Sequence, residues 1–221
     1  ARLVQALFEP QPALSDSVTY DITAWETHYR FGLTGSALTT TLAPTEAITA
    51  DAYRPAQTHA HSGEATDPYA WILPWNSMDD ARFLAEILRH DIRPRFAMNP
   101  FRLNGETFDR GTLIIPRAGN RHLGALDSLV TVAAENHART LVRSTTGAVT
   151  EGSDFGSATV RSATPPRIAL VASSGTDATS TGEIWHFFDH QLHYPLTVLG
   201  IDQLKGTSMD AFDVLILPPG D

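Results

Sequence analysis

The 221-residue sequence contains no cysteine, a single lysine (Lys205) and no long apolar segment. Without cysteine the chain forms no disulfide, carries no thiol nucleophile and holds no Cys-ligated zinc or iron–sulfur centre. The longest apolar runs, such as residues 168–172, fall far short of the roughly 20 residues that a membrane-spanning helix needs. No signal-like segment opens the chain, so we expect any signal peptide to lie outside it.

Acidic residues outnumber basic ones by 25 to 16, which gives a net charge of −9. That excess disfavours binding to nucleic acid or to an anionic membrane surface. Hydrophobic residues make up 42% of the chain, enough to build a buried core. Composition and length together predict an acidic globular protein of two modest domains, with no nucleic-acid partner and no membrane span.

A stretch rich in Ser, Thr and Gly, from Ser153 to Pro166, separates two parts of the sequence. It ends in Pro165-Pro166, which can continue neither a helix nor a central strand. The part that follows holds 7 acidic and only 2 basic residues. We therefore expect a mixed α/β accessory domain over residues 1–160 and a second α/β domain over residues 165–221.

Local patterns in the first part predict alternating strands and helices. Residues 69–73 are an apolar run stopped by proline, typical of a buried strand, and residues 95–98 predict the next strand of a β-α-β unit. Asn104-Gly105 is the strongest short hairpin signal in the chain, and we expect it to lead toward a strand at residues 112–115. Leucines, valine and alanines over residues 123–134 predict an amphipathic helix, followed by a strand at residues 140–143.

The helix between the first two strands carries its own start signal. Ser77 is a favourable N-cap, and Asp79 and Asp80 lie in the first turn, at the positive end of the helix dipole. Arg82 and Glu86 are spaced as an i,i+4 ion pair. The helical period predicts the following apolar stripe: Ala81, Leu84, Ile87 and Leu88.

The second part predicts a parallel sheet. Residues 167–172 form an apolar, β-branched run typical of a strand buried on both faces, and residues 196–199 and 213–217 are further strands. A capping box at Ser180–Glu183 predicts the start of a helix that carries an apolar face at residues 184–192. This order is the front half of a doubly wound sheet. Because such strands need covered faces and neighbours on both edges, we expect the chain to be a fragment.

Five segments stand out together: YDITAW (20–25), YAWILPWN (69–76), FDRGTLIIP (108–116), GEIWH (182–186) and DVLILP (213–218). They resemble the region C-terminal to the catalytic domain in large bacterial zinc carboxypeptidase-like proteins of the carboxypeptidase A type. In those proteins the last portion is similar to a class I glutamine amidotransferase. The resemblance implies a truncated flavodoxin-like, amidotransferase-like sheet at the end of this chain.

The same resemblance implies an exported bacterial polypeptide, periplasmic or extracellular, whose zinc peptidase domain lies upstream of residue 1. Zinc would then belong to that domain, with no cofactor and no catalytic residue in this chain. The expected function is that of a non-catalytic accessory region. Its expected partners are the upstream peptidase domain and a peptide or cell-wall ligand.

A zinc carboxypeptidase with its own site is the alternative. His61-Ser62-Gly63-Glu64 matches the His-x-x-Glu pattern of that family, and His59 lies two residues away. Neutral imidazole and carboxylate suit Zn²⁺ and leave a position for an activated water. Nine His and 25 acidic residues produce such a short pattern readily by chance, so we favour a surface loop without metal.

Two other parts of the carboxypeptidase site have candidate residues in this chain: the clamp for the substrate's carboxylate and the third zinc ligand. Asn120-Arg121 has the residue types of the clamp, but we expect this pair to end a strand and start a helix. His137 or His186 could supply a third zinc ligand to the His-x-x-Glu pattern.

A second alternative is a small-ligand-binding module. Open α/β sheets bind ligands at the carboxyl ends of their strands. The expected lining there is Ser173, Ser174, Gly175 and Thr176 after the first strand, with Pro219 and Gly220 after the third. Backbone N–H groups at the start of the helix that contains Glu183 could hold an anion. A helix cap and loop that bind nothing remain the favoured interpretation.

Histidines and tryptophans suggest two other sites that we do not favour. His186, His190 and His193 resemble a metal cluster, but only the first two share a helix face, and we expect that face to be solvated. Trp25, Trp71 and Trp75 could form a platform for sugar or peptide, although tryptophan is more often a core anchor.

Overall fold

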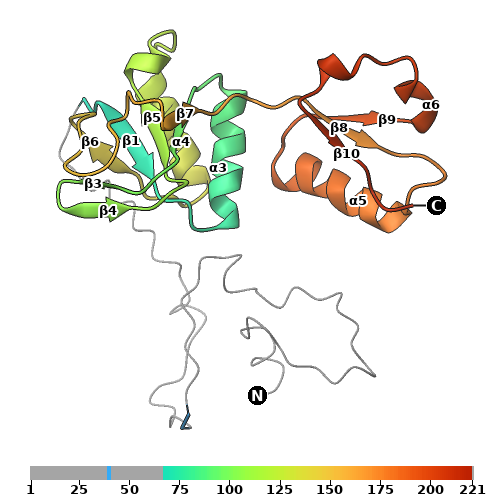
Figure 1. The fold of residues 1–221 in the computed structure, drawn as a ribbon, viewed down its shortest axis with the longest axis horizontal. Coiled ribbons are helices and arrows are strands. Elements are labelled where there is room, and N and C mark those ends of the chain that lie inside the picture. The colour runs from blue at the N-terminus through green and yellow to red at the C-terminus, as the bar shows by residue number, and fades with distance from the viewer. Residues whose placement is uncertain (1–38, 41–66, 221) are drawn as a thin grey trace.

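A computed structural model describes residues 39–40 and 67–220 of the chain. Figure 1 shows two lobes joined by a segment around residues 163–167 that is neither helix nor strand. Both lobes combine helices and strands, so the expected mixed α/β class is confirmed. No helix in the described ranges is long and apolar enough to cross a bilayer.

The first lobe is built on a five-stranded sheet of order β6-β1-β5-β2-β7, in which every neighbouring pair is antiparallel. Its elements are β1 (Ala70–Leu73), α3 (Met78–Arg89), β2 (Arg95–Ala97), β3 (Phe101–Leu103), β4 (Glu106–Phe108), β5 (Leu113–Pro116), η1 (Ala118–Asn120), α4 (Leu126–Asn136), β6 (Val142–Ser144) and β7 (Val160–Ser162). The expected β-α-β unit is therefore present, but β5 lies between β1 and β2.

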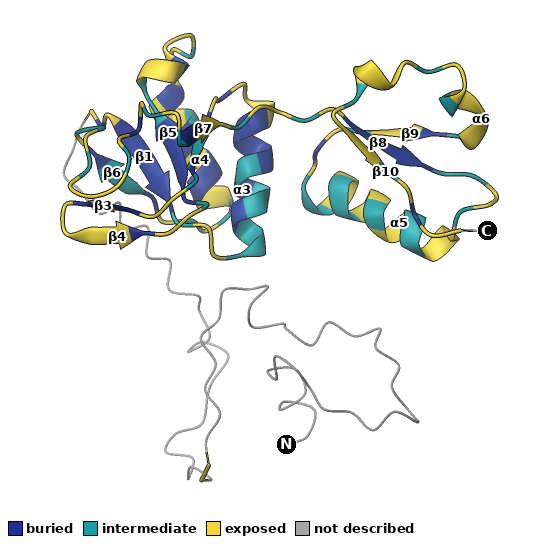
Figure 2. Ribbon diagram, in the orientation of Figure 1, coloured by how far each residue is buried: buried dark blue, intermediate teal, exposed yellow. Residues whose placement is uncertain are grey.

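The two faces of this sheet bury separate cores. Trp71 and Leu73 on β1 pack with side chains of α3 and α4, whereas Ala70 and Ile72 belong to the core on the opposite face. Successive side chains of a strand point to opposite faces, which explains the alternation. Figure 2 shows the resulting buried centre of the lobe in dark blue.

The Asn104-Gly105 hairpin covers the second face. Both turn residues have positive φ, 52° and 85°, as a type I′ turn requires. The turn joins β3 to β4, which form a separate two-stranded sheet. Phe101 and Phe108 stack across it with ring centroids 5.0 Å apart. The hairpin signal was correct, but the second strand of the hairpin is β4, and the chain reaches the main sheet only at β5.

The N-terminus of α3 holds a buried carboxylate. Ser77 caps the helix as expected, and Asp80 completes a capping box by accepting from the backbone N–H groups of Asn76 and Ser77, each at 2.6 Å. Asp80 is only 1% exposed. Its second oxygen accepts from Arg139, which follows α4, at 3.0 Å. The first turn of α3 is thereby tied to the end of α4.

Glu86 makes a second tie between the same two helices. Its carboxylate lies 2.7 Å from Nε2 of His137 and accepts from the side-chain amide of Asn136 at 2.9 Å. The expected Arg82–Glu86 pair does not form, because Glu86 faces α4 and Arg82 pairs with Asp79 at 2.6 Å instead.

The buried face of α3 is wider than the expected stripe. Phe83 is fully buried, whereas Ala81 and Leu84 are only half-buried. Ile87 belongs to the core of the first lobe, but Leu88 packs toward the second lobe. The expected stripe was therefore partly wrong, because α3 contacts two bodies rather than one.

The second lobe is a three-stranded parallel sheet of order β10-β8-β9, as the sequence predicts. Its elements are β8 (Ile168–Val171), α5 (Ala178–His186), the π-helical turn η2 (Phe187–Gln191), β9 (Leu196–Leu199), α6 (Ile201–Leu204), η3 (Met209–Ala211) and β10 (Val214–Ile216). Every residue of the central strand β8 is buried, whereas β9 and β10 are largely exposed.

A small apolar cluster joins the two lobes. Ala85 and Leu88 of α3 pack with Ile168 of β8 and with Tyr194. The Tyr194 hydroxyl donates to the carbonyl of Pro166 at 3.0 Å, and burial raises the pKa of this phenol. The contact therefore depends on one aromatic ring placed between the interlobe segment and α3.

Replacing Asp80 by Ala should cost about 3–5 kcal/mol of unfolding free energy, because Arg139 and two backbone N–H groups lose their buried partner. Urea denaturation measures this loss. Asp79→Ala is the matched control: it removes a half-exposed carboxylate and should cost about 1 kcal/mol or less. Equal losses in the two variants would contradict the structural role of Asp80.

The contact between Asp213 and Arg167 makes the stability of the second lobe depend on pH in the acid range. Hydrogen bonds from the side chain and the backbone N–H of Arg167 lower the pKa of its carboxyl from 3.8 to about 2. A carboxyl whose pKa is lower in the folded state stabilises the fold at pH values above its pKa in the unfolded state. This contribution is lost as the pH falls from about 4 to 2. Urea midpoints of the wild type and Asp213→Asn should differ at pH 7 and converge by pH 2. A difference that persists at pH 2 would exclude this pair as the cause.

Candidate functional site

The loop that follows β8, residues 173–176, is held mainly by hydrogen bonds among its own residues. The Thr176 hydroxyl accepts from the backbone N–H of Ser173 at 3.0 Å and donates to the carbonyl of the same residue at 2.9 Å. The Ser173 hydroxyl accepts from the N–H of Gly175 at 3.2 Å. These hydroxyls, which the sequence predicts as ligand contacts, are therefore used to hold the loop. Ser174 is exposed.

The segment after β10, which contains Pro219 and Gly220, lies against this loop. Thr176 and Gly220 form an isolated antiparallel bridge, and Asp177 donates its N–H to the carbonyl of Pro219 at 2.8 Å. A Cβ at Gly220 would collide with the backbone carbonyl of Gly175. The structure thus brings the expected residues together, but in direct backbone contact rather than around an open crevice.

Helix α5 begins earlier than expected. Asp177 is its N-cap, and its carboxylate accepts from the backbone N–H of Ser180 at 2.7 Å. This bond lowers the pKa of Asp177. Glu183 consequently lies in the middle of the helix, and the N-cap position already carries a negative charge. Asp177 caps the helix in place of Ser180, and its carboxylate disfavours the anion that the small-ligand alternative would place at this end.

A groove of about 460 Å³ lies beside the loop, between α5 and the sheet. Its lining residues are Leu170, Ala172, Ser173, Thr176, Ala178, Thr181, Gly182, Trp185 and Val198. The helix side of the groove combines three small residues, Ala178, Thr181 and Gly182, with Trp185, and a Cβ at Gly182 would meet open space. The lining contains no charged side chain, so this groove suits an apolar ligand rather than an anion.

Only part of the groove was expected from the sequence. Ser173 and Thr176 line it, whereas Ser174, Gly175, Glu183 and Gly220 do not. Trp185 and Val198 were not expected there. The spacing of Thr181 and Trp185, four residues apart on one helix, is the signal that places Trp185 on the same face.

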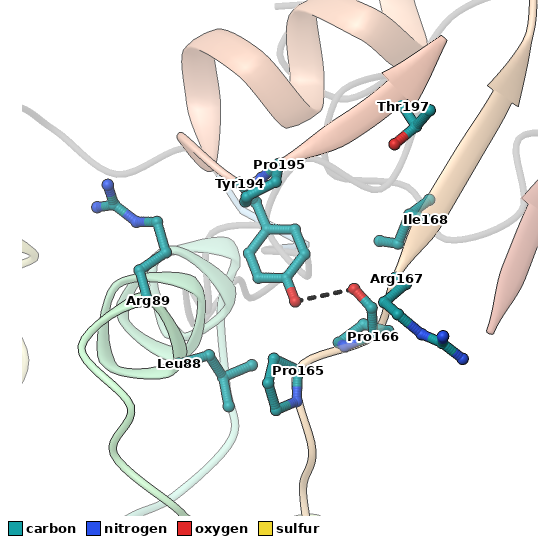
Figure 3. A pocket seen from close by; sticks show the side chains of 9 residues that line it. All are labelled: Leu88, Arg89, Pro165, Pro166, Arg167, Ile168, Tyr194, Pro195 and Thr197. Carbon is teal, nitrogen blue, oxygen red and sulfur yellow. Dashed lines mark hydrogen bonds between the residues drawn. The ribbon is translucent and has the colours of Figure 1, made fainter. Parts of the chain in front are cut away.

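A second cavity, of about 380 Å³, lies at the junction of the lobes. Figure 3 shows the Tyr194 ring near Leu88 and Pro165, with its hydroxyl bonded to the Pro166 carbonyl. The guanidinium groups of Arg89 and Arg167 point away from the ring in this view. The junction cavity is therefore mainly apolar as well.

In the part of the chain that the structure describes, possible metal ligands do not gather in groups of three or more. No group of three or more His, Asp or Glu side chains within residues 67–220 could hold a metal ion. His137, one suggested third zinc ligand, is paired with Glu86. His59, His61 and Glu64 lie outside the described residues, so the zinc alternative stays a prediction.

Asn120 has a structural role. Its amide nitrogen donates to the carbonyls of Arg93 and Pro116, at 3.2 and 2.8 Å, and its oxygen accepts from the N–H of Arg93 at 2.7 Å. The side chain is fully buried, whereas Arg121 is exposed. The two residues do not form a carboxylate clamp. Asn120 ends a 3₁₀ turn after β5, and the next helix, α4, begins only at Leu126, so the expected strand end and helix start at this pair were wrong by several residues.

Trp71 and Trp75 do not form a shared platform. Trp71 is buried in the core, with the Arg117 guanidinium 5.0 Å from its ring centroid, while Trp75 is 41% exposed. Two hydrogen bonds join Arg117 to Asp127, at 2.7 and 2.8 Å, and they lower the pKa of that carboxyl. Trp71 is a core anchor, as favoured above, and Trp25 lies outside the described residues.

Comparison with known proteins gives no relative. No protein-family model, curated protein or solved structure matches this chain.

Two glycine substitutions test the geometry of this end of the sheet. Gly182→Ala should stabilise the protein by about 0.5–1 kcal/mol, because Gly182 is in a helix and a Cβ has space there. Gly220→Ala should destabilise it by about 1–3 kcal/mol, because the added methyl collides with the Gly175 backbone. Thermal or urea unfolding measures both. A neutral Gly220→Ala would show that the C-terminal segment does not close on the loop.

Proposed function

We propose that this chain is a non-catalytic accessory region whose second lobe packs against another part of a larger polypeptide. The supporting observation is the exposure of apolar side chains on both outer strands of its parallel sheet. Val198 on β9 is 48% exposed, and Val214 on β10 and Leu217 just beyond it are 43% and 67% exposed. Parallel sheets are normally covered by other elements, so these side chains favour a protein partner.

The strand order supports the finer fold that the sequence resemblance implies. Numbered along the chain, the second lobe has the order 2-1-3, with the first strand, β8, in the centre. Flavodoxin-like sheets begin with the same order. We accordingly propose that this lobe is the front part of a flavodoxin-like, amidotransferase-like sheet.

The partner that we propose is a zinc peptidase domain of the carboxypeptidase A type on the same exported bacterial polypeptide. The motif resemblance is the support for this step. Zinc and the hydrolytic residues would then belong to that domain, while this chain contributes contact surface. The acidic character of the second lobe, with 7 acidic against 2 basic residues after Thr164, favours a contact region with basic side chains around an apolar centre.

Leu217→Glu tests the docking surface in a polypeptide that carries the peptidase domain. It should lower the stability of that polypeptide by about 3 kcal/mol or more, because an unpaired carboxylate becomes buried at the contact. The isolated chain should change by only about 0.5 kcal/mol, since Leu217 is exposed there. Thermal unfolding and exported yield measure the two effects.

Val132→Glu is the matched control, because Val132 lies on α4 and is 48% exposed, away from the second lobe's sheet. It should leave both proteins unchanged. If Leu217→Glu and Val132→Glu behave alike in the longer polypeptide, the outer strands of the second lobe are not the contact surface.

A further inference from the structure

Two histidines lie side by side on the exposed face of the second lobe's main helix. His186 is the last residue of α5, and His190 lies in the π-helical turn that follows. Their rings are nearly parallel, at 24°, with centroids 5.0 Å apart. Both side chains are exposed. Two exposed imidazoles at this separation chelate a transition-metal ion when their side chains rotate so that one ring nitrogen of each points at the ion.

The π turn holds this pair on an anchored piece of backbone. The N–H of Leu192 donates to the carbonyl of Phe187 at 3.0 Å, the i→i+5 bond of a π-helix. Phe188 and Leu192 pack against the apolar cluster between the lobes. Isolated π turns are rare and often occur at functional sites. The apolar side chains thus fix one side of the turn, while the two imidazoles remain on the solvent side.

The surroundings favour a cation. The Asp189 carboxylate lies 3.6 Å from Nε2 of His190. The Trp185 ring packs edge-on against His190, with centroids 5.3 Å apart. A negative charge attracts a metal ion, and the indole limits the positions that the imidazole adopts.

We propose that His186 and His190 form a two-imidazole site for a divalent transition-metal ion, with Cu²⁺ preferred over Zn²⁺. Imidazole nitrogens suit copper, nickel and zinc, whereas Mg²⁺ and Ca²⁺ prefer oxygen ligands. Affinity for nitrogen sites rises along the first-row series to a maximum at Cu²⁺. Water fills the remaining coordination positions. This site is independent of the proposed docking of β9 and β10.

Copper titration of the untagged chain tests the site. CuCl₂ should bind and quench tryptophan fluorescence, because Trp185 contacts His190. Loss of a group that only orients a metal ligand weakens metal binding roughly 10- to 100-fold. His186→Ala and His190→Ala each remove a direct ligand, so each should weaken copper binding by at least that factor. Trp185→Phe should remove most of the quenching but keep the copper, as measured by electron paramagnetic resonance. Acid should release the metal, since protons compete for the imidazole nitrogens.

His193→Asn is the matched control. His193 is exposed on the same segment, but its ring contacts the backbone carbonyl of Asp189 rather than the pair, so copper binding should stay unchanged. The titration is repeated in a His59→Ala, His61→Ala background, where binding should persist. Absence of binding, or binding that His186→Ala leaves intact or that the background removes, would overturn the proposal. Circular dichroism shows that each variant is folded.

Discussion

Two buried carboxylates on α3 set the arrangement of the first lobe. Asp80 and Glu86 lie six residues apart, about 1.7 helical turns, and each must find positive or donating partners because a buried unpaired charge is costly. Both find them at the end of α4, through Arg139 for the first and His137 with Asn136 for the second. The helix pair is therefore fixed by these polar contacts as well as by its apolar contact, and α3 is held in the position where Leu88 meets the second lobe.

The second lobe has a different balance. Its central strand is buried completely, but the outer strands and α5 expose much of their apolar surface. The hydroxyls of Ser173 and Thr176 bond within the loop itself, and the N-terminus of α5 is capped by the Asp177 carboxylate. What remains available is apolar surface, which is why we propose contact with another polypeptide rather than catalysis at this end of the sheet.

The candidate site shows how far sequence reasoning reaches. It correctly placed the Ser173–Thr176 loop and Gly220 at the same edge, because parallel strands bring their carboxyl ends together. It did not foresee that the backbone of Gly220 would rest on the loop, nor that Trp185 and Val198 would line the neighbouring groove. Those outcomes depend on how closely α5 and the C-terminal segment approach the sheet, which local sequence does not encode.

Local chemistry determined the elements by itself: the Ser77 cap, the Asn104-Gly105 turn and the β-branched run of β8 all act within a few residues of the chain. Only the tertiary structure decided that β5 lies between β1 and β2, and that Glu86 pairs with His137 instead of Arg82. The physical reason is the range of the interactions. Caps and turns satisfy neighbouring backbone groups, whereas strand order and buried polar pairs depend on groups that only the folded chain brings together.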